Sequence, residues 1–343
     1  MMRLCAVLLI CLSSSLLTAQ AAPPVHWSVG YHRLTFLDPL DLKPMSAIAF
    51  YPSSDREHTS RIGNYTIRAG ADTNVAIGRY PLLMLSHGNT GTPLALHDLI
   101  TSLARKGFIV VAVLHPGDNY KDQSRLGTLS NLYGRPMQIS EAITAALGDP
   151  TLSPFIEAEN VGVIGYSAGG ETALILAGAQ PNLERLRRYC RQHPDDEDAC
   201  NTKGELIVDR DDLQPVADPR VHALLLMAPL GLMFGRHTLS DVHVPVLMYS
   251  GGADTLVFPD KNAAALARKL PVAPQFKLIA GAGHFVFMAP CSPEQLQATP
   301  GLCTDAEGVN REDIHRDLIH EAGRFFTKTL STPSHGGMQT ANQ

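Results

Sequence analysis

One serine in this chain has the neighbours that a catalytic nucleophile needs. The string Gly165-Tyr166-Ser167-Ala168-Gly169 matches G-x-S-x-G, in which a sharp turn lifts the serine hydroxyl out of a sheet and glycines let nearby backbone come close. The turn also puts the hydroxyl at a helix N-terminus, where free N–H groups stabilise developing negative charge. Such a serine suits acyl transfer, and the alternative is a tight glycine turn with an idle serine.

A serine attacks well only when a histidine removes its proton, and a carboxylate must orient that histidine. Asp254 follows the apolar run VPVLMY, and His284 follows the run FKLIA, so both come after the serine in the order that the motif predicts. Asp241 and Asp260 are alternative acids. Asp241 precedes its strand and Asp260 starts a helix, so the sequence favours Asp254.

Two backbone N–H groups are predicted to form an oxyanion hole. One belongs to Ala168, directly after the serine, and the other to Asn89, which follows a strand in the string Ser-His-Gly-Asn. His87 in that string is expected to bond its own loop rather than to transfer protons. Candidate pocket residues are His115, Tyr166 and Phe285. For Phe285 and the apolar residues after it, the alternative is anchoring in the core.

Apolar runs and helical segments alternate along the middle of the chain, which predicts an α/β fold with a parallel sheet covered on both faces. The expected strands are 81–86, 108–114, 161–164, 221–227, 244–249 and 276–279, and the expected helices are 92–106, 137–148, 168–178, 260–270 and 311–330. Segments 27–36 and 45–51 are expected to add antiparallel strands at an edge.

Residues 180–219 interrupt this alternation and are rich in charge. They are predicted to form a cap over the carboxyl edge of the sheet, the alternative being a solvated surface excursion. The tail, 331–343, is poor in apolar residues and is predicted to be disordered.

Composition excludes several classes of protein. The 343 residues are 45% hydrophobic and 18% charged, so the chain can bury a large core and is not a disordered protein. The formal net charge is −5, and no basic stripe interrupts the sequence, which argues against a nucleic-acid partner. Apart from the N-terminus, no apolar run is long enough to span a bilayer.

The N-terminus resembles a cleaved secretory signal. Residues 1–21 carry one arginine, then an apolar stretch, then Ala19-Gln20-Ala21; an uncleaved anchor is the alternative. We therefore expect a periplasmic or secreted protein, with the mature chain beginning at residue 22. In an oxidising compartment the four cysteines that remain are expected to form two disulfides, most simply Cys190–Cys200 and Cys291–Cys303. Four free thiols are the alternative, and neither pair has the C-x-x-C spacing of a zinc or redox site.

The strings YPLLMLSHGNTG, VGVIGYSAGG and AGAGHF resemble the α/β-hydrolase superfamily over residues 45–330. They are more narrowly similar to platelet-activating-factor acetylhydrolases and predicted dienelactone hydrolases. The resemblance implies that 22–330 is one α/β-hydrolase domain, a serine esterase without metal or cofactor, and gives functional roles to Ser167, His284, Asn89 and Ala168. Dienelactone hydrolases use a cysteine where this chain has Ser167. The acetylhydrolases place their acid in the stretch that matches 226–229, where this chain has no carboxylate.

The sequence thus predicts a secreted serine hydrolase that cleaves a small-molecule or lipid carboxylic ester through an acyl-enzyme. Amide or peptide cleavage by the same three residues is a second hypothesis. A catalytically silent binding protein on the same fold is a third. Acyl and alcohol preference and oligomeric state have no signal in the sequence.

Overall fold

The computed structural model describes residues 26–330. The predicted signal segment, 1–21, and the predicted disordered tail, 331–343, lie outside the described residues.

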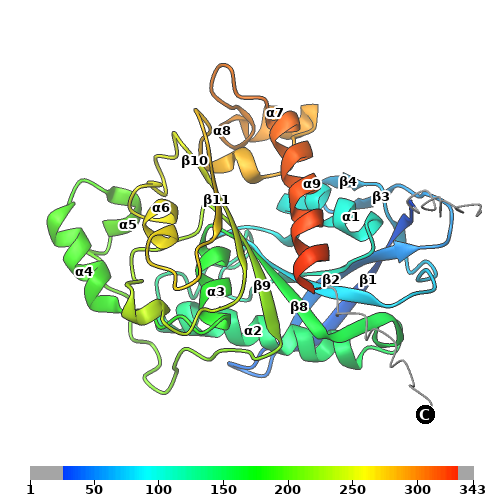
Figure 1. Ribbon diagram of the computed structural model, residues 1–343, viewed down its shortest axis with the longest axis horizontal. Helices are drawn as coiled ribbons and strands as arrows, with labels where there is room; N and C mark the ends of the chain where they lie inside the picture. The colour runs from blue at the N-terminus through cyan, green and yellow to red at the C-terminus, as the bar shows by residue number, and fades with distance from the viewer. Residues whose placement is uncertain (1–25, 331–343) are drawn as a thin grey trace, which may run out of the picture.

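A nine-stranded sheet runs through the described residues in the order β11-β10-β9-β8-β6-β7-β2-β1-β5 (Figure 1). From β11 to β7 neighbouring strands are parallel, whereas β2 pairs antiparallel with both β7 and β1. The strands are β1 (Ser28–Leu37), β2 (Pro44–Ser53), β5 (Gly70–Ala71), β6 (Tyr80–Ser86), β7 (Ile109–Leu114), β8 (Ile156–Tyr166), β9 (Val221–Met227), β10 (Val246–Gly251) and β11 (Gln275–Ile279), with β3 (Ser60–Ile62) and β4 (Tyr65–Ile67) in a separate hairpin. The predicted, mostly parallel sheet with N-terminal antiparallel strands is confirmed.

The central strands are buried on both faces, because successive side chains point into two different hydrophobic cores. On β6, Leu82 and Met84 belong to one core and Leu83 and Leu85 to the other. Helices α2 (Leu129–Gly148) and α3 (Ala168–Leu176) pack into the first core, and α1 (His97–Arg105) and α9 (Arg311–Leu330) into the second (Figure 1). None of the helices between residues 26 and 330 is long and apolar enough to cross a membrane.

The largest difference from the sequence prediction is α2, which begins at Leu129 instead of residue 137. Pro136 lies inside this helix, although proline cannot donate the i→i−4 hydrogen bond and usually ends a helix. The Thr128 side chain caps the helix by accepting from Asn131 N, and buried residues on both sides of Pro136 hold it in place. Tertiary packing therefore overrides the local signal.

Three smaller differences concern where helices and strands begin and end. The predicted helix 92–106 is a 3₁₀ turn (Pro93–Leu96) followed by α1. Helix α6 covers only Ala263–Ala267, and β8 starts five residues earlier than 161.

The segment 180–219 contains α4 (Leu183–Gln192) and α5 (Glu197–Cys200). The disulfide Cys190–Cys200 joins these two helices. A second disulfide, Cys291–Cys303, fastens the segment with α7 (Pro293–Ala298) and α8 (Pro300–Cys303). Both predicted cysteine pairings are confirmed.

Removing the Cys190–Cys200 disulfide by the double substitution Cys190→Ser/Cys200→Ser is expected to loosen residues 183–208. A cross-link across a loop this short is worth about 3 kcal/mol, so local opening should become roughly a hundredfold more frequent. Limited proteolysis read by mass spectrometry measures this as faster cleavage within that segment. Cys291→Ser/Cys303→Ser is the matched control, which should speed cleavage near 291–303 instead. Unchanged cleavage rates in both variants would contradict the expectation.

Candidate active site

Ser167 occupies a strained turn between β8 and α3. Its backbone has φ 55° and ψ −119°, a region that residues with a side chain rarely adopt and that costs of order 1–3 kcal/mol. Hydrogen bonds hold the turn on both sides: Ser167 N donates to Met227 O at 2.9 Å, and Ser167 O accepts from Gly170 N at 2.9 Å. The residue is partly exposed, so the turn presents its hydroxyl at the carboxyl edge of the sheet.

The two outer glycines of the motif are required by close backbone contacts. A Cβ on Gly165 would lie 2.3 Å from Gly169 O, and a Cβ on Gly169 would lie 1.9 Å from Ser86 O. No side chain fits at either position without moving the main chain. The two glycines therefore allow the backbones of β8, α3 and the end of β6 to approach one another closely around Ser167.

Asp254 and His284 come together after β10 and β11. His284 Nδ1 lies 2.7 Å from Asp254 Oδ2, and both side chains are buried. The other carboxylate oxygen accepts from Leu256 N at 3.0 Å and Val257 N at 2.8 Å. Since a carboxylate only accepts, Nδ1 carries the proton of the imidazole. Nε2 is then the nitrogen with a free lone pair.

Aromatic rings hold the His284 side chain from two sides. The ring centroids of Tyr166 and Phe285 lie 5.2 and 5.5 Å from that of His284. The Tyr166 hydroxyl donates to His284 O at 3.2 Å. The imidazole is thus fixed by a carboxylate at Nδ1 and by aromatic packing around its ring.

Ser167 and His284 line the same cavity, which has a volume of about 1450 Å³. Its wall includes the other predicted residues Asn89, Ala168, Tyr166 and Phe285. The insertion and the disulfide segment contribute Leu186, Asp196, Asp198, Ala199, Asn201, Thr202, Leu206, Gln295, Cys291 and Cys303. Two segments outside the sheet therefore form part of the wall of the cavity that Ser167 lines.

The loop after β6 passes beside Ser167. A Cβ on Gly88 would lie 3.2 Å from Ser167 Cβ, so the loop backbone and the serine are neighbours. Asn89 is exposed and lines the cavity. The next residue, Thr90, has a positive φ of 55°, a strained conformation that the surroundings must maintain.

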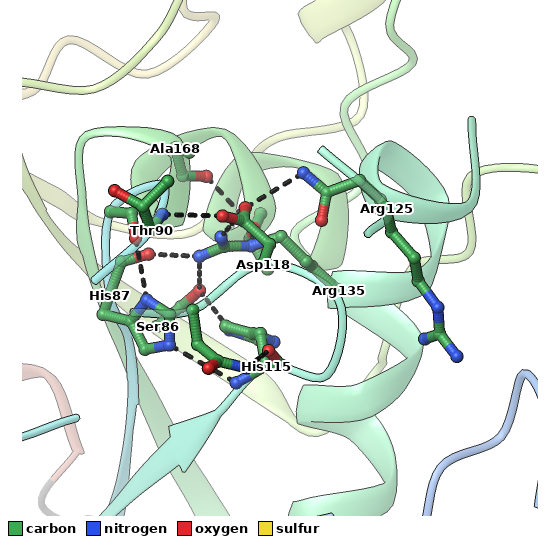
Figure 2. Close-up of polar contacts among 12 residues, drawn as sticks. Ser86, His87, Thr90, His115, Asp118, Arg125, Arg135 and Ala168 are labelled. Atoms are coloured by element: carbon green, nitrogen blue, oxygen red, sulfur yellow. Dashed lines mark hydrogen bonds and ion pairs between the residues drawn. The ribbon is translucent and has the colours of Figure 1, made fainter. Parts of the chain in front are cut away.

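A buried ion pair, Arg135–Asp118, maintains that loop (Figure 2). Asp118 Oδ1 accepts from Thr90 N at 2.7 Å, and Asp118 Oδ2 accepts from Arg135 Nη1 at 2.6 Å. The Arg135 guanidinium also donates to His87 O and, at 3.1 Å, to Ser86 Oγ. Both ends of the segment 87–90 are thus tied to one pair of side chains.

The same guanidinium reaches α3. Arg135 Nε donates to Thr172 Oγ1 at 3.2 Å, and that hydroxyl donates to Ala168 O at 3.1 Å. Arg135 and Asp118 are 3% and 0% exposed. Burial alone would raise the pKa of Asp118, but Arg135 and the hydrogen bonds from Thr90 and Asn131 hold that pKa below its usual value. The pair therefore stays ionised and links the two places where an oxyanion hole was predicted.

His115, which was expected to line or support the pocket, supports this loop and is not part of the cavity wall. It is fully buried, with Nε2 2.9 Å from Ser86 Oγ and Nδ1 2.8 Å from Gln138 Oε1. His87 Nδ1 contacts Gly88 O at 2.7 Å. Burial, reinforced by the charge of Arg135, lowers the pKa of His87 to about 3 and moves the pKa of His115 in the same direction. Both imidazoles are therefore neutral near pH 7.

Three residues of this site were not predicted from the sequence: Asp118, Arg135 and Glu171. Asp118 lies just after β7, at the edge where the other site residues gather, so its position was a usable signal. Arg135 lies just before the predicted helix 137–148, because Pro136 hides the first part of α2. Glu171 lines the cavity, and burial raises its pKa to about 8 although Arg135 acts in the opposite direction.

The described residues contain no group of three or more His, Cys, Asp and Glu side chains placed to hold a metal ion.

Comparison with known proteins gives the fold. No protein-family model matches the chain, and no curated protein matches it. Among solved structures, a ferulic acid esterase from Streptomyces cinnamoneus is similar with a TM-score of 0.63 at 17% sequence identity, covering 92% of this chain and 96% of that chain. At this identity the likeness concerns the fold, and it confirms the predicted α/β-hydrolase fold.

The buried histidines are expected to make the protein acid-sensitive. A folded-state pKa below the unfolded value means that stability is present above pH 6.5 and is lost as the pH falls toward the folded value. His87 and His115 should each contribute up to about 1.4 kcal/mol per pH unit. The raised pKa of Glu171 has the opposite effect and cancels the contribution of one histidine between pH 6.5 and 4.5. We therefore expect the free energy of unfolding to fall by about 1.4 kcal/mol for each pH unit of acidification.

Urea unfolding at pH 7.5, 6.5, 5.5 and 4.5 measures this loss. Glu171→Gln removes the offset and should roughly double the slope. A free energy of unfolding that stays level or rises on acidification in both proteins would contradict the burial of neutral imidazoles.

Proposed function

We propose that this protein is a serine hydrolase that cleaves carboxylic esters through an acyl-enzyme. The observation that carries the proposal is that Ser167, at its positive-φ turn, lines the same cavity as His284, whose ring is held by Asp254 at 2.7 Å. A nucleophile, a base and an orienting carboxylate are the groups that acyl transfer needs. The fold likeness to a ferulic acid esterase supports an ester as substrate.

In this mechanism Ser167 Oγ attacks the ester carbonyl carbon while its proton passes to His284 Nε2. Asp254 stabilises the imidazolium that forms. The N–H groups of Asn89 and Ala168 stabilise the oxyanion of the tetrahedral intermediate. His284 then gives the proton to the leaving alcohol oxygen as the C–O bond breaks, and water repeats the sequence on the acyl-enzyme to release the acid.

The cavity suits a small-molecule or lipid ester. Phe285 and Met288 give it apolar wall beside the base, whereas Val286 and Phe287 of the same segment are buried in the core. The insertion 180–219 would act as the cap, since its residues form part of the wall. The two disulfides are compatible with the periplasmic or secreted location that we propose.

Ser167→Ala is expected to abolish stoichiometric labelling by a fluorophosphonate and to lower kcat at least about 10⁴-fold, because the nucleophile is gone. Ser240→Ala, which changes an exposed serine, is the control and should label and turn over normally. Turnover of p-nitrophenyl esters from acetate to palmitate measures activity. A sharp optimum at two carbons would favour an acetylhydrolase-like pocket, and a broad long-chain profile a lipase-like groove.

Two results would replace the proposal. Turnover of anilides with no turnover of esters would make the protein an amidase. A wild-type protein that neither labels nor hydrolyses any ester would leave the binding-protein hypothesis.

Asp118→Asn is expected to lower kcat by about 10- to 100-fold with little change in KM, since the loop that carries the Asn89 N–H loses its charged anchor. The expected loss approaches that of one oxyanion-hole donor, which is 10²–10³ in kcat. The matched control is Asp218→Asn in the ion pair Asp218–Arg220, which precedes β9 at the opposite edge of the sheet. Both variants should lose stability, but only Asp118→Asn should slow turnover. Equal kcat values in the two variants would contradict a positioning role for Asp118.

A further inference from the structure

Glu171 is a carboxyl group of the cavity that the proposed mechanism does not use. It lies on α3 four positions after Ser167, which is the N-cap of that helix, so its Cα is about one helical turn along the axis from that of Ser167. It lines the cavity together with Arg135 and Thr172. A substrate seated on Ser167 would therefore share the cavity with this side chain.

Glu171 has no ion-pair or hydrogen-bond partner among the residues from 26 to 330. The nearest cation, Arg135, directs four of its five N–H groups to Thr172, Asp118, Ser86 and His87. Asp118 neutralises its charge. The carboxyl is consequently left without the partner that a charged group of this kind normally requires.

Glu171 is partly buried, and a carboxyl with a raised pKa and no protein partner is unfavourable for folding near neutral pH, because the unfolded chain ionises it freely in water. A stability cost at the wall of an active-site cavity is typical of a functional group. The protonated acid can donate one hydrogen bond into the cavity, and its carbonyl oxygen can accept another. Glu171 thus adds a hydrogen-bonding group to the wall of the cavity that Ser167 lines.

We propose that Glu171 is a specificity-determining residue that binds, as a neutral acid, an oxygen of the substrate lying about one helical turn from the scissile carbonyl. The substrate class is then a neutral ester with a keto, hydroxyl or ether oxygen on its acyl or alcohol part. This inference rests on the proposed ester hydrolysis at Ser167 and adds the polarity of the substrate to it.

Few charges act on Glu171. Among the described residues the charge that acts on its pKa is that of Arg135 on α2, and the neutral phenol of Tyr133, also on α2, is a titratable neighbour. The strands β6, β8 and β9 also pack against α3 but bring no further charge to the carboxyl. Across the cavity the insertion contributes Asp196 and Asp198, but neither affects the pKa of Glu171. The neutral form should therefore persist through neutral pH and disappear above about pH 8.

The test compares esters that differ by one keto oxygen. On the acyl side these are p-nitrophenyl 4-oxopentanoate and 5-oxohexanoate against pentanoate and hexanoate. On the alcohol side they are 2-oxopropyl acetate against propyl acetate. A ketone accepts but does not donate, so only a neutral Glu171 can bond it. One neutral hydrogen bond corresponds to about 3- to 10-fold in kcat/KM.

Wild-type protein is expected to prefer at least one keto ester by that factor at pH 7, and to lose the preference above pH 8. Glu171→Gln, whose amide donates at every pH, should keep the preference throughout. Glu171→Leu should lack it throughout. A keto-to-alkyl ratio that is the same in all three proteins and at all pH values overturns the inference.

A separate measurement without substrate tests the state of the carboxyl. Glu171→Gln should be more stable than wild type at pH 8, with the difference shrinking toward pH 4.5. A pH-independent difference would also overturn the inference. Failure of the proposed function looks different, because then no ester is hydrolysed and Ser167 is not labelled.

Discussion

The ion pair between Arg135 and Asp118 is the contact on which the geometry of the cavity depends. It is sealed from solvent, and removing one partner would leave an uncompensated buried charge, which is strongly destabilising. Its hydrogen bonds extend to Ser86, His87 and Thr90 on one side and to Thr172 on the other. A single charged contact thus fixes the distance between the loop after β6 and the first turn of α3.

The strained residues of the site follow from that constraint. Ser167 and Thr90 both have positive φ values, and neither is a glycine that adopts such a conformation easily. Strain of this kind persists only where surrounding contacts over-determine the backbone. Here the close contacts at Gly165 and Gly169 hold one turn, and the Asp118 carboxylate holds the other. Neutral His87 and His115 fill the space behind the loop without adding a second positive charge beside Arg135.

The wall of the cavity is built partly by the rigid sheet and partly by two segments that disulfides hold in place. Its floor is the carboxyl edge of a sheet that is buried on both faces. This rigid sheet fixes the relative positions of Ser167 and His284. Its far wall comes from the insertion and from the segment 291–303, each fastened by a disulfide. These short cross-links replace the hydrophobic core that such small segments cannot build by themselves. Glu171 lies on the rigid side, so the group that we propose for substrate recognition is positioned as firmly as Ser167, the proposed nucleophile.

The sequence determined the local parts of this protein. The G-x-S-x-G string, the alternation of apolar runs and helices, and the cysteine spacing depend on neighbours along the chain, and the turn at Ser167, the parallel sheet and both disulfides follow from them. The cysteine pairs lie only 10 and 12 residues apart, so little of the tertiary fold was needed to pair them.

Only the tertiary structure decided which charges meet. Asp118 and Arg135 lie on different elements, and Pro136 disguised the helix that carries Arg135, because burial of α2 outweighs a local signal that normally ends helices. The isolation of Glu171 also depends on Arg135 being occupied elsewhere. Hydrogen bonding and desolvation are set by partners distant in the chain, and no spacing rule within one sequence describes them.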